Sequence, residues 1–153
     1  MDLPPDFRDL LAEFERAGVE YVLVGGWAVA HHGRPRATKD IDFVLRGTAA
    51  NLTRAATALE AFGAPPSICA AVASMAPDDV VFLGHPPLRV DLLRSISAVS
   101  TDQLFANAVP AQLDDVRLLV ASLDDLITNK RAVGRPQDLL DVAFLEKVRA
   151  RRK

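Results

Sequence analysis

Two aspartates separated by a single residue lie in the stretch KDIDFVL, where Asp40 and Asp42 precede an apolar run. Aspartate is a poor strand former, and two neighbouring carboxylates repel each other, so the pattern needs a compensating interaction. On a strand, alternate side chains share a face, so both aspartates would project to one side and Ile41 and Phe43 to the other. Two carboxylates on one face suit a hard divalent cation such as Mg2+. An exposed strand start, with both aspartates in water, is the alternative.

Two adjacent glycines, Gly25 and Gly26, follow the apolar residues VLV upstream of these aspartates. Glycines between a strand and a helix leave backbone N–H groups open to a ligand, and the positive end of the next helix suits a phosphate. A simple turn that joins two elements explains the same pair.

A third carboxylate, Asp91, lies in the otherwise apolar stretch LRVDLL. A single acid inside a buried strand needs a partner or a cation, whereas one on an exposed strand face needs neither. Three acids on strands, together with a turn suited to phosphate, are harder to explain by separate structural roles than any one of them alone.

The elements that must position these residues are readable from the hydrophobic pattern. Apolar residues at helical spacing predict an amphipathic helix over 6–17, which Gly18 ends. A strand over 19–24, a short helix over 27–32, a loop over 33–39 and a strand over 40–46 then carry the glycines and the first two aspartates.

The second half of the chain continues this alternation. Thr48 predicts the cap of a helix that runs to about Phe62, and Ser122 predicts the cap of another. Strands over 79–84 and 88–93 should form a hairpin, and so should strands over 108–113 and 116–121, with Pro110 on an edge. The remaining predicted segments are a loop over 63–68, an Ala-rich helix to Met75, and helices over 122–133 and 137–152. These patterns predict one α/β domain, with a core over 1–121 and C-terminal helices over 122–153, and disfavour an all-parallel sheet.

Composition is that of a folded globular protein. The 153 residues are 50% hydrophobic and 25% charged, with a net charge of -2, so no global positive field attracts nucleic acid. The single cysteine, Cys69, excludes an intramolecular disulfide. The N-terminus does not resemble a signal peptide, and no apolar run is long enough to span a bilayer, so we expect a cytoplasmic protein without a membrane partner.

The motifs GGWAVAHHG, RATKDID and LDDLITNKRAVGRPQDLLDV occur in this order. Their order resembles the polymerase-beta-type nucleotidyltransferase superfamily, and more closely the small bacterial nucleotidyltransferases related to the AbiEii toxins of toxin–antitoxin and abortive-infection systems. The resemblance spans residues 20–145. It implies a nucleotidyltransferase fold, with a mixed β-sheet flanked by helices and a C-terminal helical segment.

The resemblance also implies roles for individual residues. Gly25 and Gly26 would hold the triphosphate of a nucleotide, and Lys130 would contact its phosphates. The metal, Mg2+ or Mn2+, would be bound by Asp40, Asp42 and Asp91, which also form the implied catalytic set.

Three further residues belong to these motifs. Arg36 and Thr38 precede the aspartates and would either reach the nucleotide or brace the loop. Trp27 stands where much of the superfamily has a serine whose hydroxyl helps to bind phosphate, so the sequence departs from the wider pattern there.

The leading hypothesis is therefore a metal-dependent nucleotidyltransferase that moves an NMP from an NTP to a hydroxyl acceptor and releases pyrophosphate. The resemblance implies tRNA or a protein as acceptor and a toxin role with a cognate antitoxin. The alternatives are a small-molecule, antibiotic-modifying nucleotidyltransferase, which we expect to need more helical surface than this chain offers, and a nucleotide- or partner-binding domain without turnover. Base preference and oligomeric state are open from the sequence.

Overall fold

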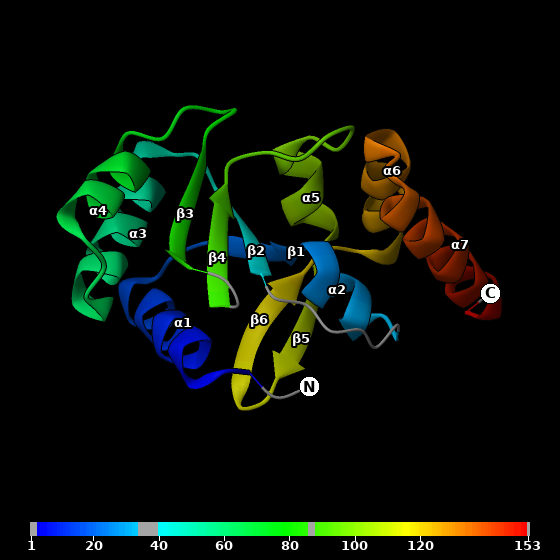
Figure 1. Cartoon of the computed structure of the whole chain (residues 1–153), viewed down its shortest axis with the longest axis horizontal. Helices are drawn as coiled ribbons and strands as arrows, with labels where there is room; N and C mark the ends of the chain where they lie inside the picture. The colour runs from blue at the N-terminus through cyan, green and yellow to red at the C-terminus, as the bar shows by residue number, and fades with distance from the viewer. Residues whose placement is uncertain (1–2, 34–39, 86–87, 153) are drawn as a thin grey trace.

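The computed structural model describes residues 3–33, 40–85 and 88–152. Helices and strands alternate along these residues (Figure 1). The helices are α1 (Pro5–Ala17), α2 (Gly25–His31), α3 (Ala49–Phe62), α4 (Pro66–Ala73), α5 (Thr101–Asn107), α6 (Leu123–Val133) and α7 (Pro136–Arg151). The strands are β1 (Tyr21–Val24), β2 (Asp40–Leu45), β3 (Val80–His85), β4 (Leu88–Leu93), β5 (Val109–Leu113) and β6 (Val116–Val120).

The six strands form one mixed sheet in the order β3-β4-β2-β1-β6-β5. The central strand β2 pairs antiparallel with β1 and parallel with β4, and β1 pairs parallel with β6. The two predicted hairpins, β3–β4 and β5–β6, form the outer pairs of the sheet. Pro110 lies in the edge strand β5, where its missing N–H costs no central hydrogen bond. The prediction of a mixed α/β fold is confirmed.

The N-terminal helix α1 packs against one face of the central strands. Phe43 of β2 and Tyr21 of β1 meet Phe14 of α1 in a cluster of three rings, with centroids 5.2–6.2 Å apart. Ile41 and Phe43 are fully buried. Because side chains alternate along a strand, this burial directs Asp40 and Asp42 to the opposite face of the sheet.

Several helix ends form as the sequence predicts. Thr48 Oγ1 accepts a hydrogen bond from the amide of Asn51, at 3.2 Å, and Ser122 Oγ accepts one from the amide of Asp125, at 3.1 Å. Gly18 ends α1 in the left-handed region, with φ of 72°. These caps satisfy backbone groups that a helix leaves unpaired at its ends.

The structure differs from the predicted elements in three places. The helix after the second glycine begins earlier than expected, because Gly25 and Gly26 are its first two residues. The predicted loop over 63–68 is wrong at its end, because Pro66 starts α4 and suits the first turn of a helix, where no N–H is needed. Helix α5 was not predicted at all, although Ser100 caps it by accepting a hydrogen bond from the amide of Gln103.

None of the helices formed by the residues that the structure describes is long and apolar enough to cross a membrane. Helices α6 and α7 lead away from the sheet at one end of the molecule, and α3 and α4 lie at the other (Figure 1).

Candidate active site

Gly25 stands directly against the second aspartate of the β2 pair. Strand β1 ends at Val24, which pairs in register with Asp42, so the chain turns into α2 beside that carboxylate. Gly25 has a φ of 71°, and a Cβ atom at this position would overlap Asp42 Oδ2 and lie 3.1 Å from its Cγ. The position therefore requires glycine for two reasons, the backbone conformation and the close approach of a carboxylate.

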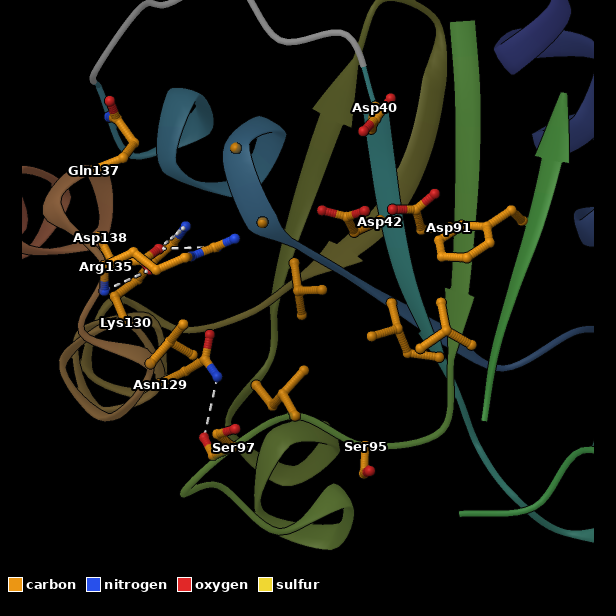
Figure 2. A pocket seen from close by; sticks show the side chains of 18 of the residues that line it. Asp40, Asp42, Asp91, Ser95, Ser97, Asn129, Lys130, Arg135, Gln137 and Asp138 are labelled. Carbon is orange, nitrogen blue, oxygen red and sulfur yellow. Dashed lines mark hydrogen bonds and ion pairs between the residues drawn. The ribbon is translucent and has the colours of Figure 1, made fainter. Parts of the chain in front are cut away.

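Three carboxylates meet on the open face of the sheet. Asp42 of β2 pairs in parallel register with Asp91 of β4, and Asp40 lies two residues before Asp42 on the same face. Figure 2 shows the three side chains side by side on the two strands. We call Asp40, Asp42 and Asp91 the carboxylate cluster. The sequence placed each on a strand, and the strand order brings them together.

The cluster holds more negative charge than its surroundings favour. Burial, a hydrogen bond with Asp91 and the charges of Asp91 and Asp40 raise the pKa of Asp42 to about 7, against a smaller opposing effect of Lys130. A carboxyl group with such a pKa is partly protonated at neutral pH. The local field therefore favours an added positive charge.

One cation already touches the cluster and was missed from the sequence. Arg89 Nε donates to Asp91 Oδ1 at 2.8 Å, and Arg89 Nη2 lies 3.1 Å from Asp40 Oδ2 and 3.2 Å from Asp91 Oδ2. The hydrogen bond with Asp91 and the charges of the neighbouring carboxylates raise the pKa of Arg89, so it stays charged. The sequence signal that could have found Arg89 is its spacing from Asp91, because residues two apart on a strand lie on the same face.

The carboxylate cluster opens into a hollow of about 1160 Å³. Gly25, Gly26 and Lys130 line the same hollow. Its polar lining includes Ser95, Ser97 and Asn129, which sequence reasoning did not single out. Its apolar lining is Val24, Val80, Phe82, Leu93, Ile96 and Val133.

Lys130 reaches the hollow from α6 but is engaged by other side chains. Its Nζ lies 3.2 Å from Asp138 Oδ1 and 3.4 Å from Asp141 Oδ2, and all three residues are buried. Arg135 Nε bonds Asp138 Oδ2 at 2.7 Å. Figure 2 shows Lys130, Arg135 and Asp138 together on the α6–α7 side of the hollow, away from the three aspartates. We call Lys130, Arg135, Asp138 and Asp141 the α6–α7 ion cluster.

Burial and hydrogen bonding act in opposite directions on the pKa of Asp138. Burial would raise it, but hydrogen bonds from Arg135 and Lys130 and their positive charges outweigh burial and lower it. Asp138 also accepts a hydrogen bond from the amide of Arg135, at 3.2 Å, which caps the start of α7. Asp138 therefore both caps α7 and pairs with two cations.

Two conspicuous residues of the GGWAVAHH stretch have structural surroundings. Trp27 is buried and packs edge-on against Phe7, with ring centroids 6.3 Å apart, and it does not line the hollow. His32 is buried, and its Nε2 lies 3.0 Å from the carbonyl oxygen of Ala121. The departure at Trp27 thus concerns the core. Arg36 and Thr38 lie outside the residues that the structure describes.

The carboxylate cluster suits a hard divalent cation, because all three side chains offer oxygen ligands and the negative charge of the cluster is in excess. Across the described parts of the chain, no three acidic, histidine or cysteine side chains are already arranged to hold a metal ion. Arg89 bonds two of the three carboxylates. The residues therefore fit a metal chemically, provided that Arg89 moves.

No protein-family model matches the sequence, and no curated protein matches it significantly. Solved structures are similar in fold. The lincosamide antibiotic adenylyltransferase LnuA, with lincomycin bound, superposes with a TM-score of 0.63 at 16% identity, over 96% of this chain and 98% of that chain. The chain has a nucleotidyltransferase fold.

Two structures of the antibiotic-resistance factor ANT(2'')-Ia agree with this result. The solution structure gives a TM-score of 0.59 at 16% identity, over 95% of this chain and 86% of that chain. The complex with adenylyl-2''-tobramycin gives 0.56 at 16% identity, over 94% and 91%. The closer resemblance to AbiEii-related toxins stays a prediction.

Proposed function

We propose that the protein is a metal-dependent nucleotidyltransferase that moves an NMP from an NTP to a hydroxyl acceptor. The observation that carries the proposal is the convergence of Asp40, Asp42 and Asp91 beside Gly25, at the mouth of one hollow. Three acids on two paired strands, with a pKa of about 7 at Asp42, are costly for stability alone. A site that receives a cation and a polyphosphate explains why they are together.

In the proposed reaction, the acceptor oxygen attacks the α-phosphorus of the NTP. A new phosphorus–oxygen bond forms, the bond from the α-phosphorus to the bridging oxygen breaks, and pyrophosphate leaves. Asp91 takes the hydroxyl proton as general base. The amides of Gly25 and Gly26 bind the triphosphate, and Lys130 adds positive potential on the opposite side of the hollow. Mg2+ or Mn2+ bound by the carboxylate cluster would neutralise charge on the phosphates and on the attacking and leaving oxygens.

The test is pyrophosphate release with ATP, GTP, CTP and UTP, in Mg2+ and in Mn2+, with pools of candidate acceptors. We expect Asp42→Asn and Asp91→Asn each to lose at least about a hundredfold in rate. The matched control is Asp102→Asn, an exposed acid at the start of α5, outside the hollow, which should leave the rate unchanged. Wild-type protein that releases no pyrophosphate with any NTP and acceptor would favour the alternative of a binding domain without turnover.

The acceptor of the nucleotidyl group could be a small molecule or a macromolecule, and chain length and the hollow bear on this choice. A small-molecule acceptor was expected to need additional helical surface, but LnuA is matched over 98% of its own length. Chain length therefore does not argue against a small acceptor. The hollow of about 1160 Å³, with its partly apolar lining, slightly exceeds the roughly 300–1,000 Å³ of typical ligand pockets, so it has room for a small acceptor.

We propose a small hydroxylated molecule as the acceptor favoured by this hollow, with tRNA or protein, and a toxin role with an antitoxin, as the competing outcome. Incubation with NTP labelled at the α-phosphate and separate pools of lincosamides, aminoglycosides, tRNA and protein distinguishes them. Label that migrates only with a macromolecular pool would reject the small-molecule acceptor and leave nucleotidyl transfer intact.

A further inference from the structure

Arg89 is bound by two members of the carboxylate cluster at once. Its guanidinium donates to both oxygens of Asp91, at 2.8 and 3.2 Å, and to Asp40 at 3.1 Å. The Asp91 side chain is 14% exposed, so the hydrogen bonds are partly shielded from water. Charge-assisted hydrogen bonds of this kind are about twice as strong as neutral ones.

A third contact holds the guanidinium from the side of the edge strand. Arg89 Cζ lies 4.5 Å from the centroid of the Phe82 ring. Phe82 of β3 pairs in register with Asp91, so its ring is on the face that carries the cluster. The Phe82 residue is 50% exposed, so its ring is not part of the buried core. The ring serves as a platform for the guanidinium.

These contacts place a monovalent cation where a divalent one would have to bind. The carboxylate oxygens that Arg89 occupies belong to Asp40 and Asp91, and a metal ion beside a fixed guanidinium would meet like-charge repulsion. We propose that Arg89 is the resident counter-ion of the carboxylate cluster in the metal-free protein, and that it is displaced when a divalent cation binds. This inference rests on the proposed function, in which the cluster is a metal site.

On this view Arg89 is a positioning residue that acts through the carboxylates. It lowers the repulsion among them before the metal arrives, and it weakens metal binding because its hydrogen bonds must first be broken. The strength of the Arg89 contacts would therefore set the metal concentration at which the site fills.

The experiment is a calorimetric titration of Mn2+ into the whole protein without nucleotide, together with thermal unfolding in a chelator. We expect Arg89→Met, which keeps an aliphatic chain but removes the charge, to bind Mn2+ roughly tenfold or more tightly than wild type. We also expect its melting temperature in chelator to fall, and the increase on adding Mn2+ to exceed that of wild type.

A second variant leaves Arg89 in place and removes only its platform. Because Phe82 is half exposed, Phe82→Ala should fold normally and bind Mn2+ more tightly by a smaller factor, roughly two- to fivefold. The matched control is Arg46→Met. Arg46 also lies over a phenylalanine, Phe105, at 4.2 Å, and pairs with a carboxylate, Glu20, at 3.3 Å, but none of the three lines the hollow.

The outcomes separate this inference from the function on which it rests. Tighter Mn2+ binding by both variants and unchanged binding by Arg46→Met support it, as does binding by Arg89→Met when wild type binds too weakly to detect. Equal or weaker binding by Arg89→Met and Phe82→Ala, with clear binding by wild type, overturns the inference alone. Wild type and variants that all fail to bind Mn2+ overturn the proposed metal site as well.

Discussion

The carboxylate cluster and the α6–α7 ion cluster line the same hollow but balance their charges in different ways. Among the residues that the structure describes, the α6–α7 ion cluster places Lys130 and Arg135 against Asp138 and Asp141, two cations for two carboxylates. In the carboxylate cluster, Arg89 is the one cation, in the described part of the chain, that pairs with any of the three carboxylates. The pKa of Asp138 is lowered, whereas the pKa of Asp42 is raised to about 7.

This difference separates the acids that are paired within the fold from the acids that we propose to bind a ligand. A buried charge that is fully paired holds two elements together, and here it joins α6 to α7. A carboxyl group whose pKa is raised by its neighbours costs stability in the absence of a cation, and such groups gather at functional sites. The same residue type thus has opposite roles a short distance apart.

The largest expected effect on stability comes from removing a cation of the α6–α7 ion cluster. Lys130→Met would leave Asp138 and Asp141 buried without their shared cation, so we expect the free energy of unfolding to fall by about 3–5 kcal/mol. Urea unfolding measures this loss. The control is Lys147→Met on α7, an exposed lysine whose replacement should change stability by less than about 0.5 kcal/mol. A loss below about 1 kcal/mol for Lys130→Met would show that the α6–α7 ion cluster is not balanced as described.

The next effect is a difference between the two clusters in how their contribution to stability depends on pH. Asp42 has a folded-state pKa of about 7, against an ordinary value of 3.8, so the metal-free folded state binds its proton more tightly than the unfolded state does. Its contribution to stability is therefore present below pH 4 and lost as the pH rises to 7. Asp138, with a lowered pKa, has the opposite sign, because its contribution is present above pH 4 and lost as the pH falls through its folded-state pKa.

We therefore expect Asp42→Asn to be more stable than wild type in chelator at pH 8, by about 2–4 kcal/mol, with the difference shrinking towards pH 4. Asp138→Asn should be less stable than wild type at pH 8. Denaturant unfolding across this range provides both curves. Parallel curves for wild type and Asp42→Asn would remove the evidence that the carboxylate cluster is unbalanced.

The smallest effect concerns the contact between Gly25 and Asp42. Gly25→Ala should lower the free energy of unfolding by about 1–3 kcal/mol, since alanine is strained at a φ of 71° and its Cβ overlaps the Asp42 carboxylate. Gly63→Ala is the matched control, because Gly63 also has a positive φ, of 99°, but has open space at the Cβ position. Equal losses for the two variants, by urea unfolding, would mean that the approach of Asp42 adds nothing.

Much of the fold was predictable from local sequence patterns, because each pattern reflects a local physical preference of the chain. Apolar and β-branched runs beside turns predicted all six strands, and Thr48 and Ser122 marked two helix starts through their capping side chains. Helix α5 was not predicted because it is only seven residues long and has one buried residue, Leu104, so its apolar periodicity is a weak signal.

The site was predictable only as separate parts. The alternation of β2 put Asp40 and Asp42 on one face, but the parallel pairing that brings Asp91 beside Asp42 is a long-range contact with no local signal. Arg89 was overlooked because its importance depends on that same pairing. The engagement of Lys130 by Asp138 and Asp141 depends on how α6 meets α7, so the family resemblance implied a phosphate contact for Lys130 but not these ion pairs.

The most direct test of the account is a crystal structure of the protein with Mn2+ and a non-hydrolysable NTP, in which anomalous scattering locates the metal. We predict a metal peak bound by Asp40, Asp42 and Asp91, phosphate oxygens at the amides of Gly25 and Gly26, and an Arg89 guanidinium released from the carboxylates. A metal or nucleotide found elsewhere, with Arg89 still bonded to Asp40 and Asp91, would contradict it.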